Sequence, residues 1–137
     1  MGRCGDSICS SDHQFAYKAG HSTTMCTLLI KEVTNHFVSH SSPVYCCLID
    51  ASKAFDKVRY DKLYDILFER KVPPSIIRLI MSCYQSQSVR VQWKNCQSNV
   101  FQMKNGVKQG GILSPLLFTL YMDKLLLKLK SSHVGCH

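Results

Sequence analysis

The sequence predicts a mixed fold of the α/β (α+β) class, and three patterns carry that prediction. Apolar residues recur at helical spacing in four separate segments. One short apolar run, Val44 to Ile49, has the length and composition of a strand buried on both faces. Residues 88–104 alternate between apolar and polar side chains, which is typical of a β-hairpin. With 137 residues and 45% apolar content, the chain has room for one hydrophobic core.

The N-terminal third predicts an irregular segment, a helix and the strand. Residues 1–13 have no periodicity and are expected to be irregular. From Ser22, a residue of the N-cap type, apolar side chains continue at helical spacing to about Ser39. His-Ser-Ser-Pro at 40–43 ends that helix. The strand Val44 to Ile49 then places Asp50 at its C-terminal end.

The remainder predicts two helices, the hairpin and a last helix. Asp61 precedes one set of apolar residues at helical spacing, and Pro73-Pro74-Ser75 precedes another. The hairpin is expected to turn between Asn95 and Asn99 and to have one polar, basic face. Ser114-Pro115 predicts the start of the last helix, with a serine cap and a proline in the first turn.

Net charge, cysteine content and hydropathy indicate the kind of partner and the cellular compartment. Lys and Arg outnumber Asp and Glu by 17 to 9, a formal charge of +8, which favours a polyanionic partner. Eight cysteines without a preceding hydrophobic signal segment are expected to be free, buried thiols in an intracellular compartment, the nucleus or the cytoplasm. The apolar stretch from Ile112 to Leu129 is interrupted by charged residues, so we expect no membrane-spanning segment.

Two segments resemble motifs A and B of reverse transcriptases. They are the run Cys46 to Asp56, which contains Asp50 and Ala54-Phe55-Asp56, and the run Asn105 to Tyr121. Residues 14–24 add a third match, and together the three are most similar to the non-LTR (LINE-type) retrotransposon branch. The resemblance implies that a partial reverse transcriptase domain at 14–137 follows the irregular segment 1–13.

The fold that the resemblance implies is part of a right-hand polymerase. It consists of fingers and palm, with an antiparallel palm sheet backed by helices. An aromatic-x-Asp-Asp segment is absent from the 137 residues, so the central catalytic strands and the thumb are expected to be missing.

The resemblance makes Asp50 the catalytic carboxylate. It implies that Asp50 is a metal ligand, that the backbone carbonyl of Ala51 is a second, and that the ions are Mg²⁺ or Mn²⁺ in the full-length parent. Carboxylate oxygens are the ligands that Mg²⁺ prefers. Taken alone, Asp50 would sooner be a turn residue after a strand.

The residues that follow Asp50 are expected to bind the incoming nucleotide. By resemblance, the backbone amides of Lys53 and Ala54 approach the triphosphate, and Phe55 lies under the sugar and excludes a 2′-hydroxyl. The alternative for Phe55 is a core aromatic. Asp56 is expected to be structural and to cap the following segment.

Motif B contributes the other nucleotide contacts. By resemblance, Gln109 and Gly110 contact the incoming nucleotide and the templating base, where glycine lets the backbone approach a ligand. Lys108 and Lys18 are candidate contacts to nucleic acid, although a solvated lysine is nearly as plausible at 108.

The resemblance implies that the chain is a fragment of an RNA-directed DNA polymerase. The parent enzyme uses an RNA template, a DNA primer and deoxynucleoside triphosphates. One carboxylate cluster is missing, so the fragment itself is expected to be catalytically silent. The alternatives are a basic, non-catalytic nucleic-acid-binding remnant or a relic without function. Two sets of possible zinc ligands lack paired C-x2-C spacing and are interpreted as chance: Cys4, Cys9 and His13, and His133, Cys136 and His137.

Overall fold

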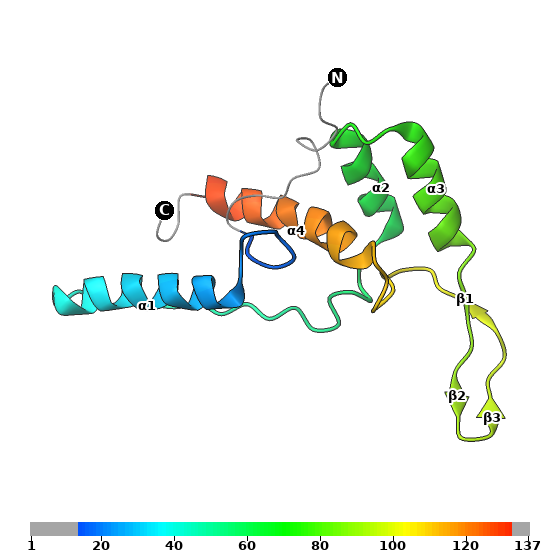
Figure 1. The fold of residues 1–137 in the computed structure, drawn as a ribbon, viewed down its shortest axis with the longest axis horizontal. Coiled ribbons are helices and arrows are strands. Elements are labelled where there is room, and N and C mark those ends of the chain that lie inside the picture. Colours follow the sequence, from blue (N-terminus) through cyan, green and yellow to red (C-terminus); the bar gives the residue numbers. More distant parts are fainter. Residues whose placement is uncertain (1–13, 133–137) are drawn as a thin grey trace. The chain divides into compact units, whose positions relative to one another are not determined.

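The structure is a computed structural model that describes residues 14–132. These residues divide into two units, each described by itself. Unit 1 is Lys53–Tyr121, and unit 2 consists of residues 14–52 and 122–132. The mixture of helices and short antiparallel strands confirms the α+β class. Figure 1 gives the elements in chain order. Both sets of possible zinc ligands lie outside the described residues.

Helix α1, Thr23–Ser39, starts and ends where its sequence predicts (Figure 1). Ser22 is the N-cap, and its hydroxyl oxygen accepts a hydrogen bond from the Met25 N–H at 3.2 Å. None of the helix residues is buried. Its large apolar side chains, such as Leu28 and Leu29 at 57% each, are exposed. The helix therefore depends on local capping and backbone hydrogen bonds.

Replacing Ser22 with alanine is expected to lower the helix content of α1, because one N–H of the first turn loses its acceptor. The expected cost is about 1 kcal/mol of helix stability. Circular dichroism of the variant measures the loss, and Ser39→Ala, at the opposite end of α1, is the control. Equal helicity in the wild type and Ser22→Ala would contradict this role for the cap.

The strand predicted at Val44 to Ile49 is wrong. The structure assigns no strand there, and Tyr45 and Leu48 are more than 90% exposed. A strand needs a neighbour for its backbone N–H and C=O groups. Within the described residues, strand pairing is confined to the hairpin, so this segment has no partner.

The expected burial of the cysteines is also wrong. The described free thiols, Cys26, Cys46, Cys47, Cys83 and Cys96, are exposed except for the half-buried Cys26. Two of them belong to the unpaired segment 44–49, so their exposure has the same cause as the missing strand.

Helices α2, Tyr60–Glu69, and α3, Pro74–Gln85, confirm the two helices predicted between the motifs. Arg59, the N-cap of α2, donates two hydrogen bonds to the Asp61 carboxylate, at 3.1 and 2.6 Å. The guanidinium holds the pKa of that carboxyl below its usual value. The prediction that Asp56 caps the following segment is therefore wrong. Helix α2 begins at Tyr60, and its N-cap residue is Arg59.

The hydrophobic core lies entirely in unit 1. It is built from one face of α2, one face of α3, the first turns of α4 and the loops that precede α2, α3 and α4. Its members are Val58, Leu63, Tyr64, Ile66, Leu67, Val72, Ile77, Ile80, Tyr84, Val107, Leu117 and Leu120. The core therefore fixes the two loops that carry the candidate nucleotide contacts.

The hairpin has four short strands in two antiparallel ladders. The outer ladder pairs β1, Ser88–Val89, with β4, Phe101–Gln102, and the inner ladder pairs β2, Gln92–Trp93, with β3, Cys96–Gln97. The turn is Lys94-Asn95, earlier than predicted. The returning strand carries one extra residue between the ladders, which is a β-bulge.

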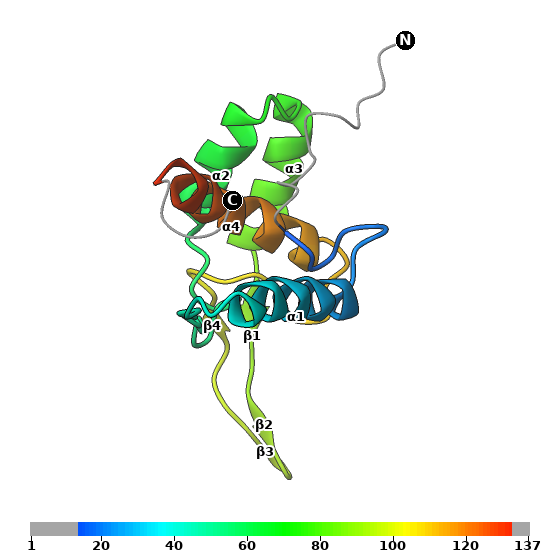
Figure 2. The same ribbon diagram turned by 90° about the vertical axis from the view of Figure 1, so that its left-hand side faces the viewer.

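The bulge explains why the alternation misplaced the turn. The Ser98 N–H donates to the Val91 carbonyl at 2.9 Å, and the Val91 N–H donates to the Ser98 hydroxyl at 3.0 Å. Ser98 therefore belongs to the paired arm and is not part of the turn. Figure 2 shows β2 and β3 at the end of the hairpin farthest from α2 and α3.

Helix α4, Ser114–Ser131, begins where predicted, but without the predicted cap. The Ser114 hydroxyl is buried and has no hydrogen-bond partner among the described residues. Among the described helices, none combines the length and the apolar character needed to cross a bilayer.

Candidate nucleotide site

Two loops distant in sequence are hydrogen-bonded to each other in unit 1. The Gly106 N–H donates to the Val58 carbonyl at 2.8 Å, and the Val107 N–H donates to the Phe55 carbonyl at 2.9 Å. Val58 and Val107 are buried in the core and hold the two loops in register. The structure thus joins the segment after Asp50 to the segment before Gln109.

Gly106 permits this close approach. Its φ is +94°, and a Cβ there would lie 3.0 Å from the Asp56 Cα and 3.1 Å from the Asp56 carbonyl oxygen. Gly110 also has a positive φ, +79°, but its Cβ would meet nothing within 4 Å. Gly106 therefore allows the two loops to approach each other, whereas the backbone of Gly110 stays open to a ligand.

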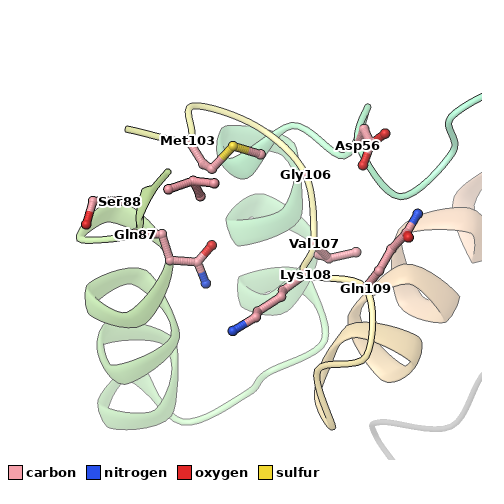
Figure 3. Close-up of a pocket in the computed structure, with 9 residues that line it drawn as sticks. Asp56, Gln87, Ser88, Met103, Gly106, Val107, Lys108 and Gln109 are labelled. Atoms are coloured by element: carbon pink, nitrogen blue, oxygen red, sulfur yellow. The ribbon is translucent and has the colours of Figure 1, made fainter. Parts of the chain in front are cut away.

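A pocket of about 380 Å³ lies beside the joined loops. Asp56, Lys108 and Gln109 line it from the two loops, and Gln87 and Ser88 line it from the base of the hairpin. In Figure 3, Asp56 and Gln109 lie at one end and Gln87 and Ser88 at the other. The pocket has the size of a small-ligand site and carries side chains that can hydrogen-bond a polar ligand.

Gln109 and Lys108, which the resemblance singled out as candidate contacts, line this pocket together with residues it did not single out. Gln87 and Ser88 belong to no motif. Their position depends on the fold, because the Met103 N–H donates to the Gln87 carbonyl at 3.2 Å and closes the hairpin beside the second loop. No local sequence signal marks such residues.

Phe55 stacks on Phe118 of α4. The two ring centroids are 4.5 Å apart and the planes are inclined by 20°. Phe55 is half-buried against the core. The ring is thus held in one orientation while part of it stays accessible.

The turn before Phe55 leaves two backbone donors free. Lys53 has φ +53°, and its carbonyl accepts from the N–H groups of Asp56 and Lys57 at 3.1 and 3.2 Å. Within the described chain, the Lys53 and Ala54 N–H groups donate to no protein acceptor. Successive free N–H groups at a residue of positive φ are a common anion-binding arrangement.

Asp50, Ala51 and Lys18 belong to unit 2, whereas the other candidate residues belong to unit 1. Asp50 and Ala51 are exposed and lie outside regular structure. Lys18 is half-buried in the turn region before α1. Phe55 is therefore hydrogen-bonded to the loop of Gln109 within unit 1, whereas Asp50 belongs to unit 2.

The oxygen atoms of Asp50 and Ala51 are of the chemical type that binds divalent metal ions. A carboxylate and a neighbouring carbonyl are hard oxygen ligands, and both residues are exposed. Across residues 14–132, no group of three or more His, Cys, Asp or Glu side chains could hold a metal by itself. Mg²⁺ commonly takes one or two carboxylates and completes its shell with substrate phosphates and water, so Asp50 and Ala51 fit as part of a shared site.

Comparison with known proteins identifies the family to which the chain belongs. The family of reverse transcriptases (RNA-dependent DNA polymerases) matches residues 8–137. The chain belongs to this family, whose members use divalent metal ions and act on nucleic acid and nucleotides.

Individual relatives place the chain among retrotransposon proteins. It is 33% identical over 103 residues to a Pol polyprotein from the R2DM retrotransposable element of Drosophila melanogaster. It is 31% identical over 107 residues to one from the R2 element of Nasonia vitripennis, and 30% identical over 117 residues to a probable RNA-directed DNA polymerase from transposon BS of D. melanogaster.

These matches cover 75%, 78% and 83% of the chain and confirm the resemblance to the non-LTR branch. The chain spans only about a tenth of the length of each relative, 10%, 10% and 12%.

Proposed function

We propose that this chain forms the incoming-nucleotide side of an RNA-directed DNA polymerase active site from a non-LTR retrotransposon. The substrates are deoxynucleoside triphosphates, an RNA template and a DNA primer. The observation that carries the proposal is the pair of hydrogen bonds from Gly106 and Val107 to Val58 and Phe55, since they join motifs A and B beside a pocket.

Asp50 and the Ala51 carbonyl are the ligands this chain contributes to Mg²⁺. When bound, two such ions activate the attacking hydroxyl and stabilise the leaving phosphate oxygens. The exposure of both residues supports this role, because a metal shared with a substrate triphosphate needs accessible ligands.

The turn that follows binds the triphosphate. The free N–H groups of Lys53 and Ala54 donate to phosphate oxygens, and the Lys53 side chain adds a positive charge. Binding through backbone donors makes the geometry of the turn more important than the side chain at Ala54.

Phe55 discriminates deoxyribose from ribose. Its stack on Phe118 fixes the ring, and a fixed ring rejects a 2′-hydroxyl by contact, whereas a mobile ring would move aside. Gln109 and Gly110 contact the nucleotide and the templating base, because both are exposed at the open end of the loop. Lys108 and Lys18 contact the nucleic acid backbone.

Binding of dTTP to the 137-residue chain in the presence of Mg²⁺ tests this assignment. Gln109→Ala is expected to weaken binding about tenfold to a hundredfold, since a hydrogen bond to a charged group contributes about 1.5–3 kcal/mol. Gln92→Ala, an exposed glutamine of β2 outside the pocket, is the matched control. Equal losses in both variants, or none in either, would contradict the proposed site.

The chain alone is expected to extend no primer. Nucleotidyl transfer by two metals requires more carboxylates than Asp50 supplies, and the 137 residues contain no aromatic-x-Asp-Asp segment. Incubation with a primed RNA template, dTTP and Mg²⁺ checks this. Primer extension that persists in Asp50→Asn would reveal a contaminant, whereas extension abolished by Asp50→Asn would contradict the expectation.

A further inference from the structure

The tip of the hairpin carries an exposed tryptophan that packing does not explain. Trp93 is the only tryptophan of the chain and is 76% exposed. Its cross-strand partner is Cys96, a small, exposed residue that cannot cover an indole. None of the ring contacts found within residues 14–132 involves Trp93. The indole therefore offers an open, flat, apolar face.

The sequence around Trp93 is basic and contains no acidic residue. Lys94 follows it at the turn with φ +53°, and Arg90 lies on the same arm. The Arg90 guanidinium donates to the Gln97 carbonyl oxygen across the hairpin at 2.7 Å, which restrains the arm. Between Glu69 and Asp123 the sequence contains seven Lys or Arg residues and no Asp or Glu. A polyanion can therefore approach this part of unit 1 without meeting a carboxylate of the same segment.

We propose that the Trp93 tip of the hairpin binds single-stranded nucleic acid, with a base stacked on the indole and a phosphate held by Lys94. Aromatic rings beside basic groups are the usual platform for unpaired bases, because every base presents a π face. The tip suits this ligand better than a protein surface. The exposed apolar neighbour of the indole on the same arm is Val91, and Cys96 lies opposite Trp93 in the inner ladder, whereas every charged residue of the hairpin is basic.

Hydrogen bonds within the hairpin strengthen the assignment. The two bonds between Val91 and Ser98 and the inner ladder pair the arm up to the turn, so Trp93 is presented on a hydrogen-bonded ladder and not on a loose loop. Figures 1 and 2 agree that the tip projects from the helices of unit 1. The nucleotide pocket lies at the base of the same hairpin, so the arm places the stacking site at a distance from the pocket. The proposal shares with the proposed function only the premise that the chain binds nucleic acid.

The single tryptophan makes the test direct. The 137-residue chain is titrated with a 12-nucleotide oligo(U) or oligo(dT) at low salt while indole emission is recorded. Binding is measured independently by the anisotropy of a labelled oligonucleotide. We expect saturable quenching of Trp93 and an affinity that falls with salt. No binding at low salt, or binding that leaves the indole emission unchanged, would overturn the proposal.

Substitutions separate stacking from general charge attraction. Trp93→Ala is expected to weaken binding about tenfold, and Trp93→Phe to retain most of it. Lys94→Gln should reduce the salt dependence by about one phosphate contact. Phe68→Ala, at an exposed aromatic of α2, is the matched control and should bind like the wild type. Equal binding by Trp93→Ala and the wild type, or self-association that depends on Trp93, would overturn the proposal. Normal dTTP binding by Trp93→Ala distinguishes failure at the tip from failure of the nucleotide site.

Discussion

Replacing Leu63 with alanine is expected to lower the free energy of unfolding by about 2–5 kcal/mol. Leu63 is 0% exposed, in the middle of α2, and its side chain lies in the core that holds both motif loops. Removing the isobutyl group leaves a cavity whose lining loses its packing contacts. Total stabilities of small domains are commonly about 5–15 kcal/mol, so this loss is a large fraction of the whole.

Leu79→Ala is the matched control for Leu63→Ala. Leu79 is the same residue type in the neighbouring helix α3, but its side chain is 62% exposed. Its replacement is expected to change stability by less than about 0.5 kcal/mol. Urea unfolding followed by circular dichroism measures both variants. Similar midpoints for the two would mean that the α2 and α3 faces are assigned wrongly.

Replacing Gly106 with alanine is expected to be the most damaging change in the site. The left-handed backbone at φ +94° costs about 1–3 kcal/mol for a residue with a side chain. The new methyl group also meets the backbone of Asp56 at 3.0 Å and would push the two loops apart. Both stability and dTTP binding should fall.

Gly110→Ala separates the two causes. Its φ of +79° imposes a similar strain, but the methyl group meets nothing within 4 Å. We therefore expect Gly106→Ala to lose more stability in urea unfolding than Gly110→Ala. Equal losses would show that the contact with Asp56 contributes nothing beyond backbone conformation.

Local patterns in the sequence were sufficient to predict the helices. Ser22 caps α1, and Pro74 and Pro115 lie in the first turns of α3 and α4, because capping residues and first-turn prolines act on their own segment. The hairpin was also predicted, but the bulge at Ser98 was not. A bulge depends on pairing between strands, which alternation along one strand does not report.

The strand at Val44 to Ile49 failed for a related reason. Its apolar composition favours burial between neighbours, and strand formation depends on those neighbours more than on the segment itself. The candidate site was predicted in part. The resemblance singled out Lys108 and Gln109, which line the pocket, whereas Gln87 and Ser88 line it only through tertiary packing.

The most direct test of the central proposal asks whether Asp50 and the Gln109 loop bind the same nucleotide. NMR spectra of the ¹⁵N-labelled chain are recorded with dTTP and Mn²⁺, which broadens the amide signals of residues near the ion. We expect broadening at Ala51, Lys53 and Gly110 that requires dTTP and is lost in Asp50→Asn, while Asp65→Asn behaves like the wild type. Broadening that is independent of dTTP, or that persists in Asp50→Asn, would contradict the proposed site.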